Sequence, residues 1–352
     1  MKKFFGAFIT VFKWLIIGVI FIEILCFLVI SGSNYLIYGK VREGSRVRYD
    51  PYALFLNKGG VRPTAHNPPP PWKNPHLLIW MFGGSTMRGS TDHDDRTIPS
   101  YLAEMFNRRE QPGQVTVVNY GENSFNSLLE TKYLQKLLIE ADRAPQVIIF
   151  YDGANDSSYF AQYRTPDGHH GYRRLRGLIE SYHESFFGLL KPLNAAFYSS
   201  FTKEVYDKLR QTVVPLRTDS PELQQMVTLT VKRYDYVQKT AACYGARFLL
   251  FWQPIWWVES QEVAPAVQEQ EKQYMLTGER FAPVRHNFAV IYLALAHALK
   301  EKPYFVDFQN VLCSRTAPVY QPDGVHLNDL GRRLVAQEMN RVLREKGVWE
   351  WF

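Results

Sequence analysis

The sequence predicts an α/β fold built on a parallel β-sheet and preceded by an N-terminal transmembrane helix. From about residue 76 onwards, short apolar runs alternate with segments of helical periodicity, a pattern typical of a parallel sheet covered by helices on both faces. Several of these runs end in Gly, Ser, Asn or Asp, and ligands of such folds bind at the carboxyl ends of the strands. Residues 4–30 are almost wholly apolar, which suits a membrane span.

The N-terminal apolar segment is interrupted by Lys13 and Glu23. We expect residues 1–31 to be an uncleaved, single-pass membrane anchor, because the apolar core of a signal peptide, the competing interpretation, is usually about 7–15 residues long. Basic residues lie on both sides of the segment, so the positive-inside rule does not orient it. A short N-terminal tail followed by an anchor favours export, and we therefore expect the larger domain to lie outside the cytoplasm.

Glu23 is costly in lipid, which suggests pairing with an integral-membrane partner. The alternative is that its side chain reaches the membrane interface, and the sequence favours neither interpretation. Residues 32–75 contain Pro63, four consecutive prolines at 68–71 and Pro75. Such composition predicts an extended, semi-rigid stalk.

The remaining chain, residues 76–352, is predicted to form one α/β domain. Its expected strands are residues 76–83, 115–120, 146–151, 247–252 and 304–308, and its expected helices lie around 97–110, 125–141, 221–244, 283–300 and 328–346. The 221–244 helix has Pro221 at its first position and Gly245 just past its end, the usual punctuation of a helix.

Two insertions are expected, at about 157–219 and 253–280. The first is rich in aromatic and basic residues, and it reads either as a lid or substrate platform near the membrane or as a helical subdomain with its own core. The second starts at Gln253, just after a predicted strand, and carries Trp256 and Trp257 near its beginning. These rings either bind a sugar or acyl group or belong to the core, and the sequence is compatible with both roles.

A serine nucleophile is predicted at Ser85, which follows an apolar strand and the turn residues Gly83 and Gly84. A serine becomes nucleophilic when a base accepts its proton. Near the C-terminus, Asp323 and His326 stand three residues apart, so that the carboxylate can orient the imidazole. We therefore expect Ser85, His326 and Asp323 to act together.

Two further segments are expected at the same edge of the sheet, because each follows a predicted strand. They are residues 119–124, which include Gly121, and residues 153–156, which include Asn155. The Gly121 N–H and the Asn155 side-chain amide would join the Ser85 N–H as donors to the oxyanion of a tetrahedral intermediate.

In this order, the four segments resemble the blocks of the SGNH (GDSL-like) hydrolase superfamily. The resemblance covers residues from about 76 to about 345 and implies a flavodoxin-like three-layer α/β/α domain with a five-stranded parallel sheet. It implies that Ser85 is the nucleophile, that Gly121 and Asn155 belong to the oxyanion hole, and that Asp323 and His326 complete the triad. One departure is Gly84, where the family usually has Asp.

Composition narrows the choice of ligands. The formal net charge is +7, but the basic residues are spread out and no nucleic-acid-binding motif is evident, so we expect no nucleic acid. A basic surface facing anionic lipid or polymer is the simpler interpretation. No His, Cys or acidic cluster has the spacing of a metal site, and the chemistry needs neither metal nor organic cofactor. Cys243 and Cys313 are expected to be unpaired, buried thiols, although pairing in an oxidising compartment stays open.

These inferences predict a membrane-anchored serine esterase or O-acyltransferase. The resemblance implies acyl, foremost acetyl, esters of an envelope or extracellular carbohydrate or lipid as substrates. Two alternatives remain: a non-hydrolytic accessory partner of a membrane-bound O-acyltransferase, and a non-catalytic SGNH-fold binding protein.

Overall fold

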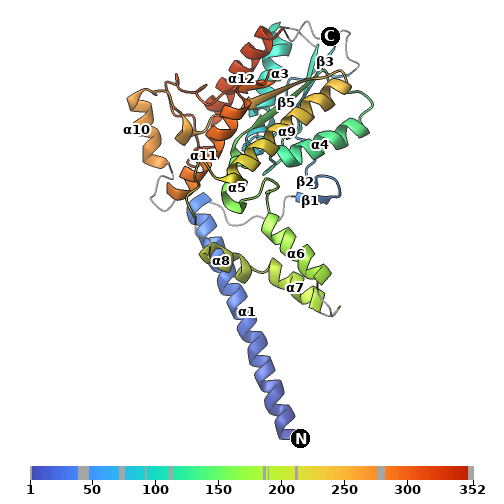
Figure 1. Cartoon of the computed structure of the whole chain (residues 1–352), viewed down its shortest axis with the longest axis vertical. Coiled ribbons are helices and arrows are strands. Elements are labelled where there is room, and N and C mark those ends of the chain that lie inside the picture. The colour runs from blue at the N-terminus through green and yellow to red at the C-terminus, as the bar shows by residue number, and fades with distance from the viewer. Residues whose placement is uncertain are drawn as a thin grey trace. The chain divides into compact units, whose positions relative to one another are not determined.

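The computed structural model describes residues 2–38, 47–70, 76–91, 93–110, 114–184, 188, 190–210, 213–275 and 282–347. The chain divides into two compact units (Figure 1). We call Val47–His170 with Val214–Phe352 the α/β unit, and Met1–Arg46 with Gly171–Val213 the helical unit.

The α/β unit contains a five-stranded, wholly parallel sheet in the order β4-β3-β5-β6-β7. Its strands are β3 (Leu77–Gly83), β4 (Val115–Asn119), β5 (Val147–Asp152), β6 (Arg247–Trp252) and β7 (Phe305–Asp307). The first strand of this sheet lies between the second and the third, which is the flavodoxin-like order. The predicted fold class is therefore confirmed.

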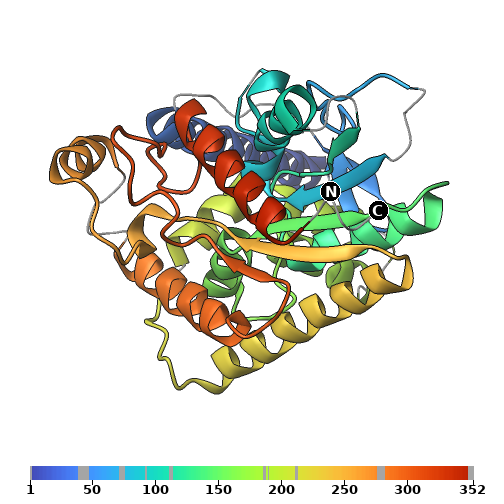
Figure 2. The same cartoon turned by 90° about the horizontal axis from the view of Figure 1, so that it is seen from above.

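Helices cover both faces of this sheet (Figure 2). One face packs against α4 (Ser127–Glu140), α9 (Pro221–Cys243) and α11 (Ala282–Leu299), and the other against α3 (Ile98–Met105) and α12 (Asp329–Glu345). A short π-helix, Phe106–Glu110, continues α3. Since side chains alternate along a strand, Trp80 and Phe82 enter the first layer while Ile79 and Met81 enter the second.

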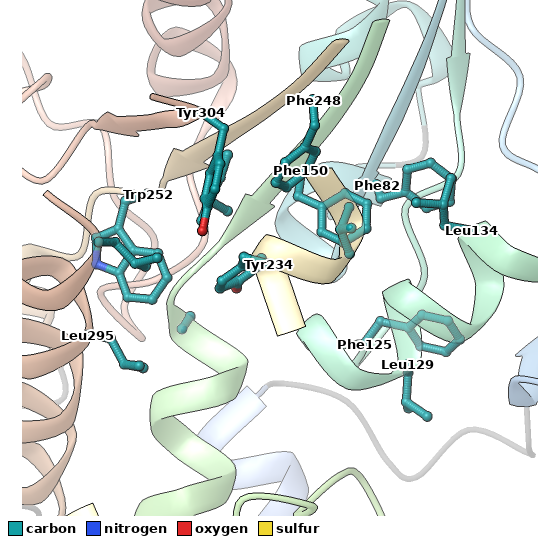
Figure 3. Close-up of a cluster of buried hydrophobic side chains, with 14 of the residues drawn as sticks. Phe82, Phe125, Leu129, Leu134, Phe150, Tyr234, Phe248, Trp252, Leu295 and Tyr304 are labelled. Atoms are coloured by element: carbon teal, nitrogen blue, oxygen red, sulfur yellow. The ribbon is translucent and has the colours of Figure 1, made fainter. Parts of the chain in front are cut away.

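The layer under α4, α9 and α11 is strongly aromatic (Figure 3). The Phe82 ring lies 5.2 Å from that of Phe150, which in turn lies 5.2 Å from Phe248. Edge-to-face and tilted contacts of this kind add to the free energy gained by burial. This core makes the carboxyl ends of β3 and β5 a rigid support.

Residues 47–70 differ from the stalk expected over 32–75. Strands β1 (Val47–Asp50) and β2 (Leu54–Asn57) pair antiparallel, and Ala53 and Leu56 are buried in the aromatic core. The Asn57 N–H and side-chain amide both donate to Glu122 in the loop after β4. The prolines did not predict this packing, because it depends on a contact 65 residues away. Residues 39–46 and 71–75 lie outside the described part.

The helical unit contains α1 (Lys2–Tyr38), α6 (Tyr172–Glu184), α7 (Leu190–Ser199) and α8 (Phe201–Arg210). Among the described residues, α1 is the one helix long and apolar enough to cross a membrane, over Phe5–Tyr35. Helix α8 packs against α1 and α7, and α7 packs against α6. Residues 171–213 of the first expected insertion (about 157–219) are therefore grouped with the N-terminal helix, while its two ends belong to the α/β unit.

Glu23 has a partner within its own chain, which differs from both sequence interpretations. Its carboxylate accepts hydrogen bonds from the Phe201 N–H at 2.6 Å, the Thr202 N–H at 3.0 Å and the Thr202 hydroxyl at 2.8 Å. These donors form the first turn of α8, where backbone N–H groups lack helical partners. Glu23 thus caps a second helix.

The cysteines are all free thiols. Cys313 is buried as expected, and its thiol has a pKa raised by burial. Cys243 is exposed at the end of α9, in contrast to the expectation that it is buried.

The packing of β2 predicts a stability effect that a stalk would not show. We expect Leu56→Ala to lower the free energy of unfolding by about 2–5 kcal/mol, because it leaves a cavity in the core. Tyr49→Ala, on the same hairpin but with Tyr49 79% exposed, is the matched control and should change it little. Chemical denaturation of the detergent-solubilised chain measures both. Equal, small effects would contradict the packing of residues 47–70 on the core.

Candidate active site

Ser85 occupies the sharp turn that ends β3. The fully buried strand reaches Gly83, and Ser85 begins the short helix α2 (Ser85–Arg88) after Gly84. A Cβ on Gly83 would lie 2.7 Å from the Met87 Cβ and 3.0 Å from the Tyr151 carbonyl oxygen. The turn is therefore too tight for a side chain at this position, and it presents the Ser85 hydroxyl at the edge of the sheet.

A continuous chain of hydrogen bonds joins Ser85, His326 and Asp323. The Ser85 Oγ lies 2.7 Å from His326 Nε2, although the two residues are 241 positions apart. His326 Nδ1 lies 2.6 Å from Asp323 Oδ2. One ring nitrogen thus faces the hydroxyl while the other is held by a carboxylate, which fixes the orientation of the imidazole.

Both oxygens of the Asp323 carboxylate take part in hydrogen bonds. Its Oδ1 accepts the N–H groups of Val325 and His326, each at 2.9 Å. Burial alone would raise the pKa of Asp323, but the hydrogen bonds from the His326 ring and from these backbone groups outweigh it and lower the pKa. Asp323 is therefore ionised at neutral pH, as an acceptor for the imidazole N–H must be.

The loop that carries Asp323 and His326 is supported by the second insertion. The backbone N–H of Trp256 donates to the Gly324 carbonyl at 2.9 Å. A Cβ on Gly324 would lie 2.6 Å from the Trp257 ring. Gly324 has φ +67°, a conformation that glycine adopts without strain. Trp256 Nε1 donates to Glu271 of α10 (Pro265–Tyr274) at 2.9 Å. In this structure both tryptophans thus pack against the loop that carries Asp323 and His326.

A buried ion triad ties the insertion to the same loop. The side chain of Arg315 is fully buried and pairs with Glu259 at 2.9 Å and with Glu271 at 2.6 Å. Glu271 also accepts the N–H of Val319 at 3.1 Å. Because breaking one partner of a buried pair leaves an uncompensated charge, this triad constrains the chain leading to Asp323.

Asn155 is brought beside Ser85 by α5 (Ala154–Tyr163), which begins directly after β5. Its Nδ2 donates to the Phe125 carbonyl at 2.6 Å. A Cβ on Gly84 would lie 2.4 Å from this nitrogen and 3.2 Å from the Phe125 oxygen. Gly84 therefore lies directly against the Asn155 amide, and a side chain at position 84 would require the Asn155 side chain to shift in this arrangement.

Gly121 differs from the expected oxyanion donor in one respect. Its N–H already donates to the Asn119 side-chain oxygen at 3.0 Å. A Cβ on Gly121 would lie 2.4 Å from the backbone nitrogen of Arg88. Gly121 therefore allows the loop after β4 to pack on α2, and its N–H is engaged in this structure.

Ser124 is a residue that the sequence reasoning missed. It has φ +65°, which is uncommon for a residue with a Cβ and is often found at functional sites. Its carbonyl accepts the Tyr159 hydroxyl at 3.0 Å, and it precedes Phe125, whose carbonyl binds Asn155. Within the described part of the chain, no hydrogen bond joins the Ser124 N–H to another group. No residue pattern marks this position.

Three buried carboxyl groups lie below Asn155. Burial raises the pKa of Glu130, Asp152 and Asp156, for Asp152 to about 7. Asp156 accepts the Ser127 hydroxyl at 2.6 Å, and the Arg233 guanidinium lies 4.0 Å from it. Burial of the three carboxyl groups and the charge repulsion between neighbouring carboxylates both favour their protonated forms. It joins the end of β5 and the start of α5 to α4.

Among the described residues, no group of three or more His, Cys, Asp or Glu side chains is arranged to hold a metal ion. The acidic run at 92–95 is described only in part, because Asp92 lies outside the described residues.

No protein-family model and no curated protein matches the chain. Among solved structures, an acetyl xylan esterase, AlAXEase, is similar at 14% identity and a TM-score of 0.39, over 76% of this chain and 100% of that one. The psychrotrophic esterase EstA from Pseudoalteromonas sp. is similar at 12% identity and 0.39, over 76% and 97%. A member of the lipolytic protein G-D-S-L family from Veillonella parvula is similar at 14% identity and 0.36, over 76% and 98%. The activity is therefore inferred from the geometry of the site and not from these similarities.

Proposed function

We propose that the chain is a membrane-anchored serine esterase or O-acyltransferase of the SGNH type. The observation that carries the proposal is the hydrogen-bonded chain Ser85–His326–Asp323, with the Asn155 amide packed against the turn that carries Ser85. A nucleophile, a base and an orienting carboxylate in this order are the parts that acyl transfer requires.

In the first half of the reaction, Ser85 Oγ attacks the ester carbonyl while His326 Nε2 takes its proton. The tetrahedral intermediate collapses when His326 returns that proton to the departing alcohol, which leaves the acyl group on Ser85. Asp323 stays ionised and stabilises the imidazolium. In the second half, His326 deprotonates a water or an acceptor hydroxyl, which attacks the acyl-enzyme. When this intermediate collapses, His326 returns the proton to Ser85 Oγ, the bond between Ser85 and the acyl group breaks, and an acid or a new ester is released.

The oxyanion would be stabilised by the Ser85 N–H, the Asn155 amide and a third donor. The third position is proposed for the Gly121 N–H, which would have to leave the Asn119 side-chain oxygen to which it donates in this structure. The Asn155 amide carries two hydrogens, so that one can stay on the Phe125 carbonyl while the other faces the oxyanion. Removing one such donor costs about 10²–10³-fold in turnover.

The anchor is proposed to remain attached in the mature protein. Contacts between α1 and α8 support this proposal. Glu23 binds the first turn of α8, and the Phe27 ring lies 5.1 Å from that of Phe201. Removal of α1 as a signal peptide would break both contacts. The chain would then be a single-pass membrane protein with its catalytic part outside the cytoplasm, acting on acyl esters of carbohydrate or lipid, with no metal or organic cofactor in the proposed steps.

The experiment that tests the proposal uses p-nitrophenyl acetate hydrolysis and labelling by a fluorophosphonate. We expect both in the wild type and neither in Ser85→Ala, because the hydroxyl forms the covalent bond in each. Ser90→Ala, an exposed serine five residues away, is the matched control and should behave as wild type. Equal background signals from wild type and Ser85→Ala in the folded protein would favour an accessory or binding role.

Asp323→Asn tests the orienting carboxylate. We expect kcat to fall on the order of 10³–10⁴-fold with little change in the unfolding temperature, since an amide no longer holds the imidazole in the required tautomer. Asp95→Asn, at an exposed carboxylate, is the control. Steady-state kinetics and thermal unfolding provide the two readings, and an Asp323→Asn variant with near wild-type kcat would contradict the role.

Gly84→Ala tests the close approach of Asn155. The added methyl group would push the Asn155 amide from its place, and we expect kcat to fall about 10²-fold with a smaller effect on KM. Gly59→Ala is a suitable control, because a Cβ there would meet no atom closer than 4.0 Å. Unchanged kinetics of Gly84→Ala would remove Asn155 from the oxyanion site.

A further inference from the structure

A group of contacts in the helical unit fixes the point along α1 at which α8 is attached. Two backbone N–H groups and one hydroxyl of the first turn of α8 converge on the Glu23 carboxylate. The Phe27 and Phe201 rings meet edge to face one turn further along α1. These contacts fix the start of α8 beside residues 23–27 (Figure 1).

Whichever part of α1 crosses the bilayer, the crossing segment includes the region around Glu23. The apolar stretch Phe5–Tyr35 is 31 residues long, whereas a span needs about 20. Every window of about 20 residues within that stretch includes residues 16–24. The start of α8 is therefore at the depth of the hydrocarbon or at its boundary, wherever along α1 the bilayer lies.

The three helices joined to this point expose apolar side chains. They come from α6, α7 and α8, and Leu209 of α8 is 82% exposed; the others are Ile179, Tyr182, Leu193, Phe197 and Tyr206. Exposed apolar groups on three successive helices need a partner of low polarity.

The same segment is basic. Residues 171–213 contain seven Lys and Arg against four Asp and Glu, a net charge of +3 within a chain of net charge +7. Basic side chains on helices with an opposite apolar face are typical of segments that lie in a membrane interface. In addition, Lys203 of α8 pairs with Asp207, which lowers the cost of placing that helix near lipid.

We propose that α6, α7 and α8 form an interfacial platform: their exposed apolar side chains enter the acyl region of the bilayer, and their basic residues contact anionic headgroups. The platform rests on the proposed membrane anchoring, and Glu23 fixes its depth. The partner is the lipid surface itself, because the attachment point already lies at membrane depth. A protein partner for these side chains is an alternative outcome of the test.

The experiment places an environment-sensitive fluorophore on single cysteines of the full chain in vesicles of zwitterionic and anionic phospholipid. The variants are Leu209→Cys, Leu193→Cys and Ile179→Cys, in a background whose native cysteines are replaced by serine. We expect blue-shifted emission that brominated acyl chains quench and aqueous iodide does not. Ile139→Cys, at an exposed residue of the α/β unit, is the control and should respond to iodide.

A probe at Val19→Cys in α1 separates failure of the platform from failure of the anchor. If Val19 reports lipid while position 209 reports water, the platform is overturned and the anchor stands. If position 19 also reports water, both are overturned, and the Ser85→Ala assay still decides the esterase activity. Probes on the three helices that neither quencher reaches would also overturn the platform, in favour of a protein partner.

Glu23→Leu tests the attachment. We expect the probe at position 209 to lose most of its quenching by brominated lipid, because α8 no longer has its acceptor on α1, while hydrolysis of p-nitrophenyl acetate is unchanged. Glu23→Gln retains a carbonyl acceptor and should restore a large part of the quenching. Full lipid quenching in Glu23→Leu would show that Glu23 does not set the depth of α8.

Discussion

Each group of the proposed oxyanion site is placed by the parallel alignment of β3 between β4 and β5. In this register Met81 lies opposite Asn119, and Gly83 lies opposite Tyr151. The three strands therefore end at one edge, and the Glu122 N–H donates to the Gly83 carbonyl at 3.0 Å. In an antiparallel arrangement consecutive strands end at opposite edges, and these loops would not meet at Ser85.

The histidine side of the site depends on a different support. The chain between β7 and α12 has no strand of its own to place His326. It is held by its own backbone pairing, in which the Gln321 N–H donates to the His326 carbonyl and the Asn328 N–H to the Val319 carbonyl, each at 2.8 Å. A buried arginine between two glutamates and backbone contacts with the insertion after β6 support this loop. Ser85 is thus positioned by the sheet, whereas the position of His326 depends on its own loop and on how the insertion after β6 packs against that loop.

Much of the fold and the Ser85–His326–Asp323 grouping could be predicted, because strand, turn and D-x-x-H spacing are local patterns. The strand bounds differ from prediction by at most one residue at each end. The rest depends on contacts between distant segments: the close approach at Gly84, the left-handed Ser124 and the packing of β2. For the same reason the sequence did not predict the partner of Glu23, since Phe201 lies 178 positions further along the chain.

That separation also has a consequence for biosynthesis. At about 5–20 residues per second, the ribosome needs roughly 9–36 s to add the 178 residues between Glu23 and Phe201. If α1 enters the bilayer as soon as it emerges, its acidic side chain waits there without an acceptor helix for that time. On the proposed anchoring, this side chain would need another hydrogen-bond donor until α8 is made.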